Sequence, residues 1–154
     1  MAEPPLHVAL MHPEIPGNTG NIGRLCVGVG AALHLVHPLG FDTSDKAVRR
    51  AGLDYWKHVD VTEHDSEAAF LAWARGRTVI AFSAKASQSY AAVDYPEGVV
   101  LLFGQETVGL PEHLRARFPC VGIPAPGPVR SLNLSNAAAV AVYHVLGKVR
   151  GEWF

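Results

Sequence analysis

Three stretches of the chain combine glycine or proline with small polar or acidic side chains. They are residues 13–24 (PEIPGNTGNIGR), 103–111 (FGQETVGLP) and 123–136 (IPAPGPVRSLNLSN). A rigid backbone that presents a few placed polar groups is what a small-molecule pocket requires. Turns and helix caps use the same residue types, but simple turns rarely need about twelve residues of such composition. The three stretches together therefore indicate a binding or catalytic site.

Each of these stretches follows a short apolar run that is typical of a β-strand. Strands are predicted at residues 6–11, 78–82 and 99–103, and a shorter one near residues 121–123. The runs at 78–82 and 99–103 lack polar alternation, which indicates strands covered on both faces of a sheet. In an open α/β sheet, ligands bind outside the carboxyl ends of the strands. The three stretches therefore lie where a ligand site is expected.

The rest of the chain alternates strands with helices. Further strands are predicted at residues 33–37 and 58–61, and helices at residues 44–50, 66–75, after Pro111, and at 134–149. The first helix is predicted to be capped by Asn18 or Thr19 and to end near Gly30. This alternation predicts an α/β fold with a mostly parallel sheet and helices on both faces, formed by a single domain over residues 1–154.

Other kinds of site do not fit the spacing. Glycines at positions 17, 20 and 23 lack the G-x-G-x-x-G order of a dinucleotide-binding turn, and no phosphate-binding P-loop pattern occurs. Ser131 and Ser135 lie outside any G-x-S-x-G elbow, which argues against a hydrolase. His34 and His37 lie in one predicted strand and point to opposite faces, so no metal site is expected.

Composition and charge restrict the function further. Hydrophobic residues make up 49% and charged residues 18%, which excludes an intrinsically disordered chain. The net charge is −1, so binding to nucleic acid requires a local basic patch or two chains that pool their charges. The two cysteines are too few for a disulfide framework, no secretory signal is visible, and no apolar run approaches the roughly 18 residues that span a bilayer. A cytoplasmic protein with no membrane segment is therefore expected.

Taken in order, the three stretches resemble the three motifs of the SPOUT (SpoU–TrmD) RNA methyltransferases. More narrowly, they are similar to the small tRNA 2′-O-methyltransferases that modify the wobble nucleotide, cytidine or a modified uridine. The matching segments are residues 14–24, 49–55, 103–107 and 130–136, and the resemblance covers essentially the whole chain. It implies an α/β domain with a deep trefoil knot in its C-terminal part, S-adenosylmethionine as cofactor, tRNA as substrate and a homodimer.

The resemblance also implies which residues bind the cofactor, namely Phe82, Gly104, Ile123 and Ser131, with Glu106 and Asn133 beside them. A glycine after a strand, such as Gly104, allows close approach of the backbone to a ligand. Ile123 can press on the adenine, and the Ser131 hydroxyl can donate and accept hydrogen bonds. Two interpretations of Glu106 stay open: a group that faces the substrate or the sulfonium, or a structural carboxylate bonded to loop amides.

Arg24 and Asn18 are the predicted catalytic residues. In the family, activation of the ribose hydroxyl is assigned to the arginine of the first motif, here Arg24. Because a guanidinium is almost always protonated, bidentate binding of the neighbouring phosphate is the better physical role for it. Asn18 is expected at the same helix N-terminus, where anions are favoured.

RNA binding is predicted for Lys46, Arg49, Arg50, Arg130 and Tyr143. The first three lie in one short basic segment that also contains aromatic residues, and such a mixture is typical of RNA contact. From composition alone, that segment is explained as well by a solvated helix face. The match to the family favours RNA.

Two residues depart from the family pattern, because Gln105 and Val108 stand where close relatives usually have proline and arginine. These departures leave the target nucleotide open. Two alternatives to a tRNA wobble methyltransferase therefore remain. One is 2′-O-methylation of another RNA site, such as ribosomal RNA. The other is a non-catalytic RNA-binding or dimerisation module.

Overall fold

The computed structural model describes residues 3–51 and 55–154 and contains a six-stranded sheet. The strands are β1 (Leu6–Met11), β2 (Ala32–Val36), β3 (Val61–His64), β4 (Val79–Phe82), β5 (Val99–Phe103) and β6 (Cys120–Val121). The helices are α1 (Pro16–Val29), α2 (Lys46–Ala51), α3 (Glu67–Ala74), α4 (Glu112–Arg117) and α5 (Leu134–Val149). Short 3₁₀ turns lie at Tyr55–His58, Tyr90–Ala92 and Gly151–Trp153.

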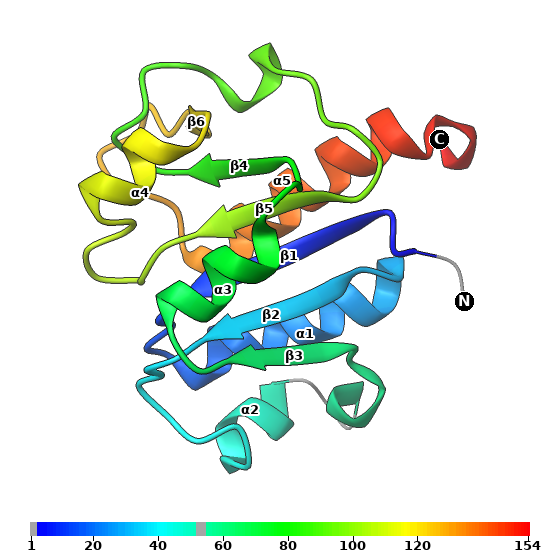
Figure 1. The fold of residues 1–154 in the computed structure, drawn as a ribbon, viewed down its shortest axis with the longest axis vertical. Helices are drawn as coiled ribbons and strands as arrows, with labels where there is room; N and C mark the ends of the chain where they lie inside the picture. The colour runs from blue at the N-terminus through cyan, green and yellow to red at the C-terminus, as the bar shows by residue number, and fades with distance from the viewer. Residues whose placement is uncertain (1–2, 52–54) are drawn as a thin grey trace.

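All paired strands of the sheet run parallel, in the order β3-β2-β1-β5-β4-β6. Parallel neighbours need crossover connections, and these place helices against the sheet. Figure 1 shows α1 and α5 behind the sheet and α3 in front of it. The predicted α/β fold, with a parallel sheet and helices on both faces, is confirmed.

The apolar core has two layers, one on each face of the sheet. Side chains alternate along the central strand β5, so Leu101 and Phe103 face one layer and Val100 and Leu102 face the other. The first layer is closed by α1 and α5, and the second by α3 and α4. Every residue of β5 is buried, which explains why this strand is apolar without alternation.

The carboxyl ends of four neighbouring strands coincide in register. Leu10 of β1 pairs with Phe103 of β5, and Phe82 of β4 pairs with both Phe103 and Val121 of β6. The chain segments that follow these strands therefore leave the sheet along one edge. This edge brings together the three polar stretches found in the sequence.

The predicted cap of the first helix is wrong. Helix α1 begins at Pro16 with Ile15 as its N-cap, and Asn18 and Thr19 lie inside its first turns. Proline suits the first helical position, because its missing N–H and fixed φ cost nothing there. The C-terminal prediction is confirmed, since Gly30 ends the helix in the left-handed conformation with a φ of 75°.

Other boundaries also differ from the prediction. The strand expected at residues 58–61 starts only at Val61, because Tyr55–His58 forms a 3₁₀ turn instead. Trp56 of this turn is buried against α1, where a Cβ on Gly23 would lie 2.7 Å from its ring. Helix α2 starts two residues later than expected, and β6 is confined to Cys120–Val121. The predicted bounds of β5 and α5 are confirmed.

None of the helices in the described part of the chain is long and apolar enough to cross a membrane. Within residues 3–51 and 55–154, no group of three histidine, cysteine or acidic side chains is arranged to hold a metal ion.

Three histidines form a hydrogen-bonded row across β1, β2 and β3. His7 Nδ1 lies 2.9 Å from His34 Nε2, and His34 Nδ1 lies 2.9 Å from His64 Nε2. Trp73 of α3 packs over all three rings. Burial, and then the neighbouring His7, lower the pKa of His34 to about 3. The row is therefore a neutral polar element of the core.

We expect the free energy of unfolding to fall as the pH is lowered below the ordinary histidine pKa of 6.5. Unfolded His34 takes up a proton near 6.5 and folded His34 only near 3, so the unfolded state binds more protons in that window. One such group changes stability by at most about 1.4 kcal/mol per pH unit. Urea unfolding between about pH 7 and about pH 5 measures this slope.

His34→Gln should show a shallower decline of stability than the wild-type protein over this range. The matched control is His58→Gln, at an exposed histidine outside the row. Equal slopes for the wild-type protein and His34→Gln would show that His34 does not couple folding to pH.

Candidate functional site

The Glu106 carboxylate accepts hydrogen bonds from the backbone just ahead of helix α1. Its Oε1 accepts a hydrogen bond of 2.9 Å from the amide of Glu14, and its Oε2 accepts one of 2.9 Å from the amide of Ile15. Both amides lie just ahead of Pro16, the first residue of α1, where the helix dipole favours negative charge. Of the two interpretations of Glu106, the structure supports the structural carboxylate bonded to loop amides.

Asn18 joins the three polar stretches. Its Nδ2 lies 3.4 Å from Glu106 Oε2, and its Oδ1 accepts a hydrogen bond of 3.2 Å from Asn133 Nδ2. Asn133 in turn caps α5, because its Oδ1 accepts bonds from the amides of Ser135 and Asn136. Asn18 is 6% exposed, whereas Glu106 is half-buried and Asn133 is exposed, so this polar junction extends from the interior to the surface. We call Glu106, Asn18 and Asn133 the junction triad.

A second contact ties the first stretch to the second. Glu14 Oε1 accepts hydrogen bonds from the Thr107 amide at 3.0 Å and from the Thr107 hydroxyl at 2.7 Å. These bonds lower the pKa of Glu14, so its carboxylate stays ionised. The sequence interpretation gave no role to either residue. Both lie inside the matched segments, but only the fold places them side by side.

The strand ends bring Phe82, Gly104 and Ile123 to one edge of the sheet. Phe82 closes β4, Gly104 follows β5, and Ile123 comes two residues after β6 ends. The Phe82 ring is buried and stacks on Phe103 at 4.9 Å between ring centroids, so it belongs to the core. Ile123 is half-buried and packs on the edge of that core. Ser131 is exposed, in the segment that leads into α5.

Gly104 is required by the protein's own loop. A Cβ at this position would lie 2.1 Å from the amide nitrogen of Leu110 and 2.2 Å from the carbonyl carbon of Gly109. The close approach that this glycine allows is thus an approach to the backbone of residues 109–110. Any larger residue at position 104 displaces this loop, so substitutions of Gly104 cannot test ligand binding alone.

Arg24 lies apart from the junction triad. It is exposed on α1, with its guanidinium carbon 5.2 Å from the centroid of the Tyr55 ring. Among the described residues, the ion pairs involve His37, His113 and Arg150, so Arg24 is paired with neither Glu14 nor Glu106. Asn18 points into the junction and Arg24 faces solvent, so within one chain the two predicted catalytic side chains do not meet.

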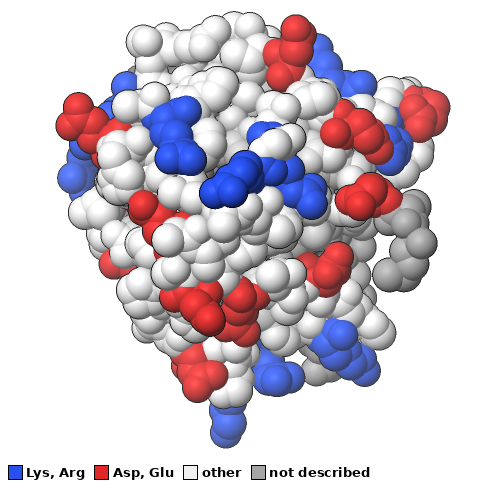
Figure 2. Space-filling view, in the orientation of Figure 1, with Lys and Arg blue, Asp and Glu red and all other residues white. Residues whose placement is uncertain are grey.

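The predicted RNA-binding residues lie on exposed surface. Lys46, Arg49 and Arg50 lie on α2, which packs against α1, the helix that carries Arg24. Figure 2 shows basic and acidic side chains interspersed over the face in view. Basic side chains lie at its lower end, where α2 lies in Figure 1. Arg130 is exposed ahead of α5, and Tyr143 on α5 is 52% exposed. Residues 52–54 of the matched segment 49–55 lie outside the described residues.

Comparison with known proteins agrees with this geometry. The family model described as "SpoU rRNA Methylase family" matches residues 5–143. A protein of Escherichia coli strain K12, named tRNA (cytidine(34)-2'-O)-methyltransferase, is 44% identical over 141 residues, which are 90% of each chain. A solved structure concerned with 2-OH methylation of C/U34 on tRNA is 52% identical, with a TM-score of 0.92, over 95% of this chain and 97% of the other.

A third protein shares the fold over part of its length. The structure of an AdoMet-bound rRNA methyltransferase from Sinorhizobium meliloti is 29% identical with a TM-score of 0.85, and the match covers 99% of this chain and 58% of that one. The family model spans more than half of the chain, and the relatives match it almost end to end. This chain belongs to the SpoU rRNA methylase family.

Proposed function

We propose that the protein is a tRNA (cytidine/uridine-2′-O-)-methyltransferase that uses S-adenosylmethionine and acts on the ribose of the wobble nucleotide. The observation that carries this proposal is the junction triad, which joins all three motif stretches at one edge of the sheet. The names of the relatives support the choice of substrate. An activity on tRNA also supports a cytoplasmic location, and we take residues 1–154 as one domain.

The residues at the strand ends fit S-adenosylmethionine in their chemistry. Half-buried Ile123 offers an apolar surface at the core edge, and the exposed Ser131 hydroxyl lies eight residues further along the same stretch. Gly122 allows close approach of two segments, since a Cβ there would lie 3.0 Å from the Ser83 carbonyl oxygen. An AdoMet-bound relative with the same fold supports this cofactor. When bound, it supplies an electrophilic methyl group on a sulfonium.

The protein's own residues orient the reaction. The ribose 2′-oxygen must approach the methyl carbon in line with the carbon–sulfur bond that breaks, and the hydroxyl proton must leave. Arg24 is exposed and, within residues 3–51 and 55–154, is paired with no acidic side chain, so its planar guanidinium suits binding of a phosphate beside the reacting ribose. The side chains of Glu106 and Asn133 hold the site by bonding the starts of α1 and α5.

We also propose that the protein forms a homodimer and that its C-terminal part is knotted. Exposed apolar side chains at Val140 and Tyr143 of α5 and at Leu132 just ahead of it suit burial by a second copy. Residues 88–90 and Gly122 exchange backbone hydrogen bonds, so the segment after β6 runs against the loop after β4, as a knot requires. Light scattering at micromolar concentration is expected to give the mass of a dimer, and a monomeric mass would contradict this.

Ser131→Leu is expected to weaken S-adenosylmethionine binding by at least about tenfold, because it replaces a hydrogen-bonding hydroxyl with bulk. Isothermal titration calorimetry measures the affinity directly. Ser131 is exposed and outside the core, so the variant should fold normally. The control is Ser44→Leu, at an exposed serine ahead of α2. Equal affinity in Ser131→Leu and Ser44→Leu would place the cofactor elsewhere.

The proposed function is tested with purified protein and short RNA. An anticodon stem-loop should accept a labelled methyl group from S-adenosylmethionine, and the same RNA with a 2′-deoxyribose at the wobble position should accept none. Transfer to both RNAs would show that another position is modified. Cofactor binding without transfer to any tRNA would favour another RNA substrate, and absence of cofactor binding would indicate a non-catalytic module.

A further inference from the structure

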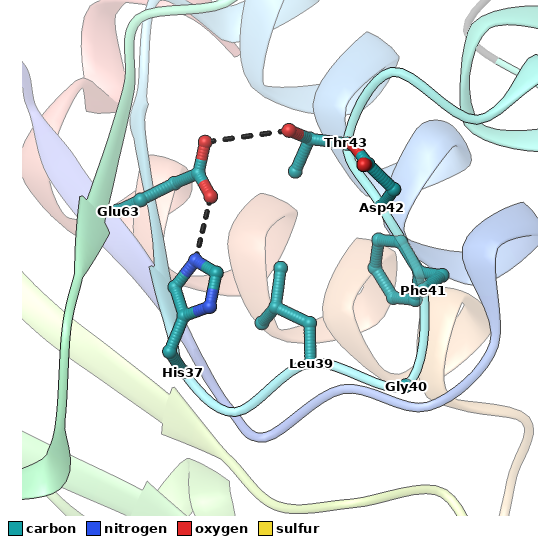
Figure 3. A pocket seen from close by; sticks show the side chains of 7 residues that line it. All are labelled: His37, Leu39, Gly40, Phe41, Asp42, Thr43 and Glu63. Atoms are coloured by element: carbon teal, nitrogen blue, oxygen red, sulfur yellow. Dashed lines mark hydrogen bonds and ion pairs between the residues drawn. The ribbon is translucent and has the colours of Figure 1, made fainter.

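A hollow of about 440 Å³ lies at the carboxyl ends of β2 and β3, outside the site described above. Figure 3 shows its lining: His37 and Glu63 on one side, with Leu39 and Phe41 projecting from the loop that follows β2. Thr43 and Asp42 complete the wall. No residue of this lining was singled out as a site residue from the sequence.

The inner surface of the hollow combines hydrogen-bond acceptors with apolar surface. Glu63 Oε1 lies 2.7 Å from His37 Nε2, and Glu63 Oε2 accepts a long bond of 3.4 Å from the Thr43 hydroxyl. A carboxylate has about four acceptor positions, so Glu63 keeps capacity for another donor. Hydrogen bonds from the Ser44 amide and hydroxyl lower the pKa of Asp42, which stays ionised at the rim. Phe41 supplies an aromatic ring on the opposite wall.

The hollow is lined by the acidic side chains of Glu63 and Asp42, and the surface next to it is positively charged. Helix α2 begins three residues after Thr43 and presents three exposed cations, Lys46, Arg49 and Arg50. A ligand that fits both surfaces carries amino groups and a flat ring at one end, and negative charge at the other. A nucleotide within an RNA chain has this arrangement, since exocyclic amino groups donate to carboxylates and phosphates bind lysine and arginine.

The hollow is adjacent to the first motif. The Gly40 amide donates a hydrogen bond of 2.9 Å to the Pro13 carbonyl oxygen, and a Cβ on Gly40 would lie 2.9 Å from the Glu14 Cα. In the strand order, β2 and β3 lie on one side of β1, and β5, β4 and β6 lie on the other. The hollow and the proposed cofactor loops therefore flank the first motif from opposite sides.

We propose that this hollow is a nucleobase pocket, which binds a base with an exocyclic amino group from the RNA strand near the methylated ribose, by donation to Glu63 and stacking on Phe41. The phosphates of that strand lie on α2. This inference rests on the proposed function for its RNA substrate. It assigns to this pocket a part in base selection that is separate from methyl transfer.

The experiment measures binding of anticodon stem-loop RNAs by fluorescence anisotropy, with each loop base replaced in turn by uracil, which has no amino group. In the wild-type protein, replacement of the base that enters the pocket should weaken binding roughly tenfold or more. Glu63→Gln, which loses the negative charge, should lose most of this discrimination. Phe41→Leu keeps apolar volume and should weaken binding of all the RNAs, because base stacking is lost.

The matched control is Glu67→Gln. Glu67 also pairs with a histidine, His113, at 2.9 Å, but it lies on α3 outside the hollow. Thermal melting checks that each variant is folded. The proposal is supported if Glu63→Gln loses base discrimination and Glu67→Gln keeps it. Equal discrimination in Glu63→Gln and the wild-type protein at every loop position would overturn it.

Two further outcomes separate this inference from the proposed function. Cytidine monophosphate that binds as tightly as the RNA would mean a site for free nucleotides and would also overturn the pocket proposal. If the wild-type protein methylates the wobble ribose and Glu63→Gln keeps full base discrimination, the pocket proposal alone is refuted. Loss of base discrimination in Glu63→Gln, in a protein that transfers no methyl group, supports the pocket and refutes the proposed function.

Discussion

Arg24→Ala is expected to fold, assemble and bind S-adenosylmethionine like the wild-type protein, and to lose methyl transfer to tRNA by at least about 100-fold. Arg24 is exposed, and its contact within the described residues is with the exposed Tyr55 ring, so its removal leaves no buried group without a partner. The loss comes from poor alignment of the ribose once the neighbouring phosphate is unbound. Single-turnover kinetics with a stem-loop RNA measures it.

Two further variants make the result specific. Arg24→Lys keeps the charge but lacks the planar pair of donors, so it should also lose most of the rate. Arg75→Ala removes an exposed arginine at the end of α3 and should keep it. Turnover near the wild-type rate in Arg24→Ala would remove Arg24 from the mechanism. A loss of cofactor affinity as large as the loss of rate would make Arg24 a cofactor-binding residue instead.

Glu106→Ala is expected to disconnect the junction triad and to impair both stability and activity. It removes the acceptor of the Glu14 and Ile15 amides and leaves the Asn18 amide group without that partner. Loss of hydrogen bonds to a charged group costs about 2 kcal/mol, which lowers the melting temperature of a chain of this size by roughly 4–8 °C. Activity should fall further than stability explains, because the start of α1 is no longer tied to the loop that follows β5.

Scanning calorimetry measures the melting temperature, and methyl transfer measured well below that temperature separates the effect on activity from the effect on stability. Glu112→Ala is the control, since it removes an exposed carboxylate at the start of α4. Glu106→Ala with normal melting and normal turnover would show that the junction triad positions nothing that the reaction needs.

The central strands and the last helix could be predicted because their patterns are local. Strand β5 is a five-residue apolar run buried on both faces, and α5 starts at an asparagine that caps its own helix. Apolar runs and side-chain caps depend only on neighbouring residues. The convergence of the three polar stretches followed from the general rule that loops meet at the carboxyl edge of a parallel sheet.

The start of α1 could not be predicted, because its cap comes from a distant part of the chain. The acceptor for the amides of residues 14 and 15 is Glu106, more than 90 positions away, so the local candidates Asn18 and Thr19 were misleading. The crowding of Gly104 by the backbone of residues 109–110 was not predicted either. Neither contact leaves a signal in the residues next to it.

The start of β3 was predicted wrongly for a similar reason, a contact with a distant residue. The segment 58–61 looks like a brief strand, but burial of Trp56 against Gly23 holds the preceding residues in a 3₁₀ turn. The hollow beside β3 was missed because its wall combines a loop after β2 with Glu63 of β3. Tertiary packing decides both features, and only the assembled sheet reveals them.

The central claim is methylation of the wobble ribose of tRNA, and mass-spectrometric mapping of modified nucleosides tests it most directly. Transfer RNA is compared from cells that lack this protein and from cells that produce it or its Arg24→Ala variant. We predict a 2′-O-methylated nucleotide at the wobble position only where the wild-type protein is made. A wobble ribose that stays unmethylated with the wild-type protein, or is methylated equally without it, would contradict the claim.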